Sequence, residues 1–145
     1  MSKRPPPNRD RFKHFNTVPT RWNDNDPYGH INNAVYYFIF DTAVNTYLIE
    51  NQILDIAKSQ TIGLVAETGC QFFAPLAYPD DIEVGLSVRS IGTSSVTYEL
   101  GLFAPNAATA AAAGHFTHVY VDKDTRKPQA LPDNFRQVLS QIIAG

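Results

Sequence analysis

Residues 34–49 constrain the fold more than any other part of the chain, because they are apolar almost all the way round a helix. Asn32 or Asn33 can cap this helix, since a short amide side chain accepts hydrogen bonds from the free N–H groups of a first turn. The clearly polar members form one stripe: Asp41, Thr42, Asn45 and Thr46. A helix that is apolar round most of its circumference is normally buried. We therefore expect the rest of the chain to wrap around it.

The wrapping elements are stretches in which apolar and polar residues alternate, a period of two that is typical of strands with one buried face. The predicted strands cover 14–22, 62–72, 82–88, 96–102 and 107–121, and an amphipathic helix covers 133–144. The alanines of 110–113 favour helix by propensity, but the residues that follow favour strand, so 107–121 is interpreted as one long strand. Short turns between consecutive strands imply antiparallel pairing. The pattern predicts an α+β architecture, with an antiparallel sheet and a helix on its face.

Composition narrows the classes of function. The chain has 145 residues and a net charge of -2, so it lacks the basic excess of a nucleic-acid-binding protein. Cys70 is the single cysteine, which makes an intramolecular disulfide impossible. Residues 1–13 have no apolar core of a secretory signal, and no apolar run approaches the roughly 20 residues of a membrane span. We expect a cytoplasmic protein with a flexible N-terminal arm over 1–13 and one domain over 14–145.

One turn-rich motif precedes the apolar helix. Residues 21–33, RWNDNDPYGHINN, resemble the signature of the 4-hydroxybenzoyl-CoA thioesterase family, and more narrowly its branch of small bacterial acyl-CoA thioesterases. Residues 72–76, 91–95 and 118–122 extend the resemblance. It implies a hotdog fold, in which a curved antiparallel sheet wraps a long central helix. It also implies hydrolysis of an acyl-CoA to a carboxylic acid and free CoA without a cofactor, in a homodimer or homotetramer whose active sites lie at the shared face.

The same resemblance implies that Asp26 is the catalytic carboxylate and that the backbone N–H of Asn33 is the oxyanion donor. Asp26 lies seven positions before Asn33 and can fold back across the turn toward the helix start. Free N–H groups there carry the positive end of the helix dipole and suit a developing oxyanion. Asp26 would attack the carbonyl carbon or activate a water, and the sequence does not choose between these routes. The alternative is a turn former whose side chain bonds the next backbone N–H groups. Asp24 is expected to be a structural partner of backbone or of Arg21.

Further residues are candidates for substrate binding. Gly29 would supply a backbone geometry or a close approach, and His30 is an alternative base or a packing residue. Glu67 is a reserve carboxylate, expected on the strand face opposite Ile62 and Leu64. Ser94 and Ser95 would donate hydrogen bonds to coenzyme A, and its phosphates would need a cation such as Arg89 or those of 123–127.

No metal site is expected, because His115 and His118 fall on opposite faces of their strand and lack suitably spaced ligands. Cys70 alternates with apolar residues and is interpreted as core. Two rival functions stay open: an enoyl-thioester hydratase of the same fold and a non-catalytic acyl-CoA-binding protein. The hydratases resemble each other in an Asp and His pair around an Asn-Pro step, which the Asp26-Pro27 step does not match well.

Overall fold

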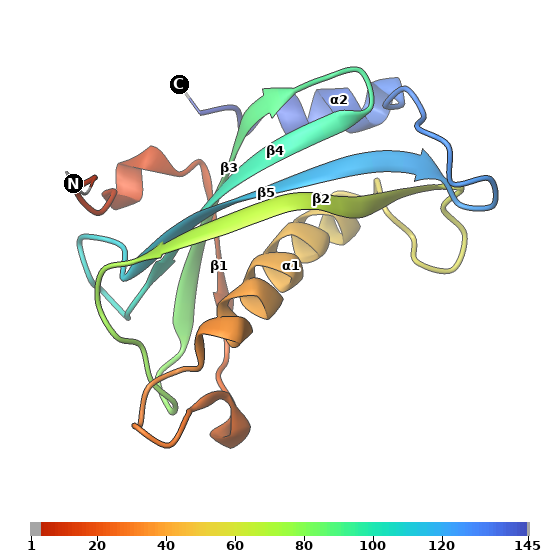
Figure 1. Cartoon of the computed structure of the whole chain (residues 1–145). Coiled ribbons are helices and arrows are strands. Elements are labelled where there is room, and N and C mark those ends of the chain that lie inside the picture. The colour runs from red at the N-terminus through yellow and green to blue at the C-terminus, as the bar shows by residue number, and fades with distance from the viewer. Residues whose placement is uncertain (1–3, 145) are drawn as a thin grey trace.

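The computed structural model describes residues 4–144, and its strands form one antiparallel sheet in the order β1-β3-β4-β5-β2 (Figure 1). The strands are β1 (His14–Val18), β2 (Thr61–Phe72), β3 (Ile82–Ile91), β4 (Ser95–Phe103) and β5 (Ala112–Asp122). The helices are α1 (Asn33–Glu50) and α2 (Asp133–Ser140), with short 3-10 helices η1 (Arg9–Arg11) and η2 (Trp22–Asp24). The order of one strand, a long helix, four strands and a final helix confirms the α+β prediction.

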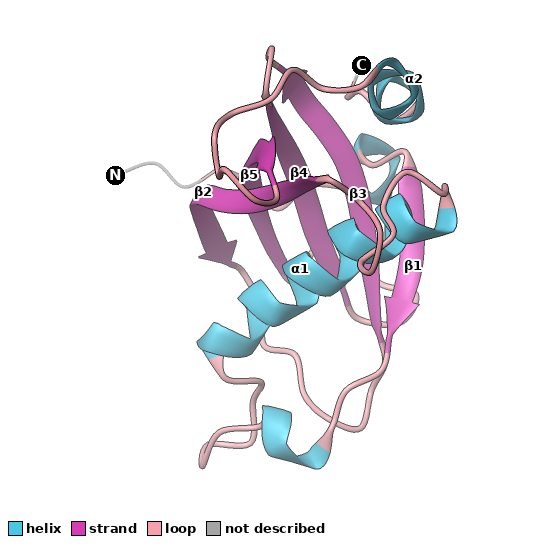
Figure 2. Ribbon diagram, turned by 90° about the vertical axis from the view of Figure 1, so that its right-hand side faces the viewer, coloured by secondary structure: helices cyan, strands magenta, loops and turns pink. Residues whose placement is uncertain are grey.

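Helix α1 lies along one face of the curved sheet, and the main core fills the space between them (Figures 1 and 2). Phe40 and Val44 on α1 and Val84 on β3 are all fully buried there. Gly114 on β5 makes room for a side chain of α1, because a Cβ at that position would lie 2.5 Å from the Phe40 ring. The predicted curved sheet around a long helix is confirmed.

The far side of α1 is not covered, which differs from the expectation of a helix buried all round. The sheet meets only one face of α1, so the opposite side, including Phe38, Asp41 and Thr42, is exposed. Phe38 keeps 70% of its surface accessible, a large apolar exposure for a folded domain. The polar residues predicted to form one stripe therefore lie on the uncovered side of α1, and exposed apolar side chains such as Phe38 lie on the same side.

A β-bulge changes which residues of β2 face the helix. The pairing of β2 with β5 shifts between Val65 and Glu67, which leaves Ala66 as an extra residue. Beyond the bulge every side chain changes face, so Thr68 and Cys70 share the helix-side face with Val65, not with Leu64. This bulge makes two predictions wrong. Residues 62–72 do not form one continuous apolar face, and Glu67 does not lie on the face opposite Leu64.

The N-terminal segment differs from the predicted flexible arm. The Phe12 ring is 7% exposed and covers the paired glycines Gly85 and Gly101, where an added Cβ would lie 2.6 Å from it. The Ala110 N–H donates to the Pro7 carbonyl, and Arg9 forms an ion pair with Glu83. The prediction is therefore wrong for residues 7–13, which pack on the sheet face opposite α1. Residues 1–3 of the expected arm, and residue 145 of the expected domain, lie outside the described residues.

Three predicted boundaries also change. The first strand ends at Val18, because η2 follows, and α2 ends at Ser140. Residues 107–111 are a loop, since the Ala107 N–H closes a turn onto the Ala104 carbonyl and Asn106 has a φ of 62°. Strand β5 therefore begins at Ala112 instead of 107.

A buried imidazole on β5 makes the stability of the protein depend on pH. His118 is 3% exposed, its Nδ1 lies 3.3 Å from the Tyr120 hydroxyl, and its Nε2 has no hydrogen-bond partner among the described residues. The Tyr120 hydroxyl in turn pairs with that of Tyr98 at 2.7 Å. Burial lowers the pKa of His118 from its ordinary 6.5 to about 4. The imidazole is therefore neutral in the folded protein at pH values where the unfolded chain is already protonated.

We expect the free energy of unfolding to fall as the pH drops from 6.5 toward 4. In that window the unfolded chain binds a proton at His118 and the folded protein does not, which costs roughly 3 kcal/mol in total. Urea unfolding of the wild type and of His118→Gln at pH 7 and pH 4.5 measures this contribution. An equally steep loss of stability in both proteins would contradict it.

Candidate active site

The motif before α1 folds into a short closed loop at one end of the sheet. Asn25 and Ile31 form a β-bridge, the Asp26 N–H donates to the His30 carbonyl at 2.8 Å, and the Gly29 N–H donates to the Asp26 carbonyl at 3.1 Å. Gly29 has a φ of 84°, a conformation that a side chain disfavours, so the predicted backbone role of this glycine is met. The closed loop carries Asp26 back toward the start of α1.

Buried anchors hold this loop in place. The carboxylate of Asp24 is 4% exposed and accepts from the Arg21 backbone at 2.8 Å and from its guanidinium at 2.9 Å. The Ile31 N–H donates to the Leu76 carbonyl at 2.8 Å, which ties the loop to the segment before β3. Asp24 is thus the structural partner of Arg21, as predicted.

The two oxygens of Asp26 have different surroundings. Its Oδ1 accepts from the Tyr28 N–H at 2.9 Å and from the His30 N–H at 3.4 Å, which is the turn-forming interaction that the sequence left open. No donor to Oδ2 is present among residues 4–144. Asp26 as a whole is half-buried. One oxygen therefore orients the side chain through the loop backbone while the other is available for a reaction.

The first turn of α1 presents an unused donor beside this loop. Asn32 is the cap: its Oδ1 accepts from the Ala34 N–H and its carbonyl from the Val35 N–H, both at 2.9 Å. The Asn33 N–H has no acceptor within the described part of the chain. This N–H and the positive end of the helix dipole make the start of α1 suitable for an oxyanion.

Aromatic and apolar side chains line the sheet side of the loop. Tyr36 is buried and packs edge-on against Phe72, with ring centroids 4.8 Å apart. Burial and, secondly, Cys70 raise the pKa of Tyr36, and the charge of Asp26 adds to the rise. The phenol therefore stays neutral near pH 7. Burial also raises the pKa of Cys70 to about 12, which agrees with a core thiol and not with a nucleophile.

His30 contributes its backbone, and its side chain is exposed. The His30 imidazole makes no hydrogen bond among residues 4–144, while its N–H donates to Asp26 and its carbonyl accepts from the same residue. The loop thus joins three of the predicted site residues, Asp26, Gly29 and His30, and the fourth, Asn33, follows as the first residue of α1.

The other four candidates lie elsewhere in the chain. Ser94 and Ser95 follow β3, whereas the loop that holds Asp26 is tied to Leu76 and Tyr78 before β3. Ten residues of extended strand, about 30 Å, separate these two ends. Arg89 and Glu67 lie on the sheet face away from α1, where they pair with Glu99 and His115. Within one chain none of these four reaches Asp26.

Two further features are absent from the part of the chain that the structure describes. Among residues 4–144, no three His, Cys, Asp or Glu side chains are grouped in a way that would hold a metal ion. In the same part of the chain neither helix combines the length and the apolar character needed to cross a membrane.

Comparisons with known proteins agree on one family. A family model described as the thioesterase-like superfamily matches residues 20–139. The crystal structure of the PA5185 protein from Pseudomonas aeruginosa is 49% identical, covers 97% of this chain and 99% of its own, and superposes with a TM-score of 0.95. PA2801, a putative thioesterase from the same organism, is 27% identical over 86% of this chain and 95% of its own, with a TM-score of 0.78. The uncharacterized protein YsmA of Bacillus subtilis is 26% identical over 59% of this chain, and the match spans 58% of its length.

Proposed function

Because this chain belongs to the thioesterase-like superfamily and has the hotdog fold, we propose that it hydrolyses the thioester of an acyl-coenzyme A. The products are a carboxylic acid and free coenzyme A. The single observation that carries the proposal is an oriented carboxylate, Asp26, in the loop that leads directly into α1 at Asn33. Among residues 4–144 one oxygen of Asp26 has no donor and the Asn33 N–H has no acceptor.

The proposed reaction uses these two groups on opposite sides of the thioester carbonyl. The carbonyl oxygen accepts a hydrogen bond from the Asn33 N–H, which stabilises the negative charge that develops on it. The free oxygen of Asp26 then acts in one of two ways. It attacks the carbonyl carbon and expels the thiolate to leave an anhydride that water hydrolyses, or it removes a proton from a water that attacks the same carbon. Both routes end with a carboxylate and a thiol.

Oligomerisation would complete the site. Strand β2 is an edge of the sheet, and Leu64 and Val65 on it are 40% and 50% exposed, a combination that favours pairing with another strand. A two-fold axis that pairs β2 with β2 of a second copy runs the two strands in opposite directions. Ser94 and Ser95 of the second copy would then approach the loop that holds Asp26 in the first copy. We propose a homodimer of this kind, or a tetramer of two such dimers, with coenzyme A bound across the interface.

Charging the sheet edge is expected to separate the copies. Val65→Lys places a cation on β2, where pairing would bury it, so we expect sedimentation to give a monomer for this variant and a dimer or tetramer for the wild type. Thioester hydrolysis should fall with dimer content. Full activity in a monomeric Val65→Lys would contradict a site that is shared between copies.

Thiol release from a panel of fatty and aromatic acyl-CoA substrates tests the proposed reaction. Hydrolysis frees one thiol for each substrate consumed. An enoyl-thioester hydratase would instead remove the enoyl absorbance without freeing a thiol, and a binding protein would show calorimetric binding without turnover. Either of these two results would contradict the proposal.

A further inference from the structure

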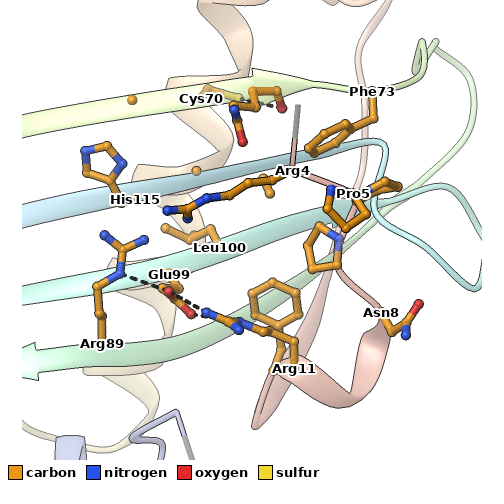
Figure 3. A pocket seen from close by; sticks show the side chains of 17 residues that line it. Arg4, Pro5, Asn8, Arg11, Cys70, Phe73, Arg89, Glu99, Leu100 and His115 are labelled. Atoms are coloured by element: carbon orange, nitrogen blue, oxygen red, sulfur yellow. Dashed lines mark hydrogen bonds and ion pairs between the residues drawn. The ribbon is translucent and has the colours of Figure 1, made fainter. Parts of the chain in front are cut away.

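The sheet face opposite α1 carries a hollow of about 910 Å³ that the proposed reaction does not use (Figure 3). The N-terminal segment forms one side of it, and residues of β2, β4 and β5 form its floor. Phe12 fills the sheet surface over Gly85 and Gly101, and the His115 ring lies over Gly69, where an added Cβ would be 2.7 Å from it. Both rings, with Gly69 and Ala113, line the hollow. The volume lies in the range of sites for small molecules.

Three guanidinium groups are directed into this hollow from different parts of the chain. Arg4 comes from the N-terminal segment, Arg11 from η1 and Arg89 from β3, and Figure 3 shows their side chains converging. Glu99 neutralises one of these charges, while Glu67 is paired with His115 at the side. The hollow therefore keeps an excess of positive charge in a chain whose net charge is -2.

Glu99 holds two of the arginines in a fixed position. It is 7% exposed and accepts from Arg11 at 3.0 Å and from Arg89 at 2.9 Å. Burial alone would raise the pKa of Glu99, but the hydrogen bonds from Arg11 and Arg89 outweigh it and lower the pKa. Because Glu99 engages only part of each guanidinium, the remaining N–H groups are oriented for a further acceptor. Arg4 has no hydrogen-bond or ion-pair partner within residues 4–144.

The opposite wall of the hollow is apolar. Phe73 and the prolines Pro5, Pro6 and Pro7 line it, and Figure 3 shows the Phe73 ring on the side where Pro5 lies. Guanidinium groups bind phosphate through paired N–H groups, and an aromatic ring packs against a flat apolar body. We propose that this hollow is a second ligand site, which binds a nucleotide-like molecule with its phosphates on Arg4 and Arg89 and its base beside Phe73.

A second copy of the chain fits this face less well. A two-fold axis that passes through the hollow would bring the arginine cluster against itself, and like charges in contact are destabilising. The N-terminal segment also forms one side of the hollow, so this face is concave. The site is independent of Asp26, which lies beside α1 on the other face of the sheet, so its test does not depend on the proposed hydrolysis.

His115 lines the hollow and serves as a reporter in NMR titrations, with ADP and inorganic pyrophosphate as probes. We expect ADP to shift the His115 ring signals and not those of buried His118, in the wild type and equally in Asp26→Asn. Arg4→Gln combined with Arg89→Gln should weaken ADP binding at least tenfold, while Lys58→Gln combined with Lys127→Gln should not. Phe73→Ala should reduce ADP binding to the level of pyrophosphate.

Three results would overturn the second site. The first is that the His115 signals do not shift at millimolar ADP. The second is that the arginine and lysine double variants bind ADP with equal affinity. The third is that the His115 shift depends on the protein concentration and not on the ADP concentration. The last result would identify the face as a contact between copies. Coenzyme A and ADP share the adenosine diphosphate group, so parallel titrations with the two molecules show which one binds more tightly.

Discussion

Asp26→Asn is expected to lower kcat for acyl-CoA hydrolysis by about 10²–10⁴-fold, the range for loss of a positioned base. The amide oxygen of Asn can still accept from the Tyr28 and His30 N–H groups, so the loop keeps its shape. What disappears is the basic, nucleophilic oxygen. Thiol release at saturating substrate measures the loss, and thermal unfolding shows whether the variant is folded.

Asp24→Asn is the matched control, because it removes the other carboxylate of the same motif. Asp24 is buried and paired with Arg21, so its replacement should lower the unfolding temperature and leave kcat of the folded protein within a few-fold of wild type. If Asp26→Asn keeps wild-type kcat, or if Asp24→Asn abolishes turnover while it stays folded, the assignment of Asp26 fails.

Phe12→Ala is expected to lower the free energy of unfolding by about 3–5 kcal/mol, as for other buried phenylalanines replaced by alanine. The ring packs against Phe103 at 5.9 Å between centroids and covers Gly85 and Gly101, so its loss leaves a cavity that the glycines cannot fill. Urea unfolding measures the change.

Phe15→Ala is the control for that experiment. Phe15 packs against the same Phe103 but is 36% exposed, so its loss should cost clearly less. A loss of less than about 1 kcal/mol for Phe12→Ala would mean that residues 7–13 are only loosely attached, as the sequence had suggested.

The alternating pattern was sufficient to predict the elements of this fold, because apolar residues recur with a period of two along the strands and α1 is strongly apolar. It did not reveal the bulge at Ala66, since one extra residue reverses the faces without changing the local composition. The docking of Phe12 was also missed. That contact joins residues more than 70 positions apart in sequence, and the two glycines that receive the ring lie among the polar residues of their predicted strands, where nothing indicates a partner.

The sequence could predict the part of the candidate site that comes from one short segment of the chain. Asp26, Gly29, His30 and Asn33 lie within eight consecutive positions, so the turn-rich sequence predicted that Asp26 can fold back toward the helix start, while the roles of Asp26 and Asn33 came from the resemblance. Ser94, Ser95, Arg89 and Glu67 were grouped with them by resemblance, but β3 and the two faces of the sheet separate them from Asp26. The ion pairs of Glu99 with Arg11 and Arg89 were not predicted. These residues come from β4, η1 and β3, and only the folded sheet brings them together.

A crystal structure of Asp26→Asn with an intact acyl-CoA would test the central claim most directly. We predict that the thioester carbonyl oxygen lies about 3 Å from the Asn33 nitrogen, with the side chain of residue 26 on the opposite side of the carbonyl carbon. A thioester bound elsewhere, such as in the hollow beside Arg89, or one whose carbonyl points away from the start of α1, would contradict the account.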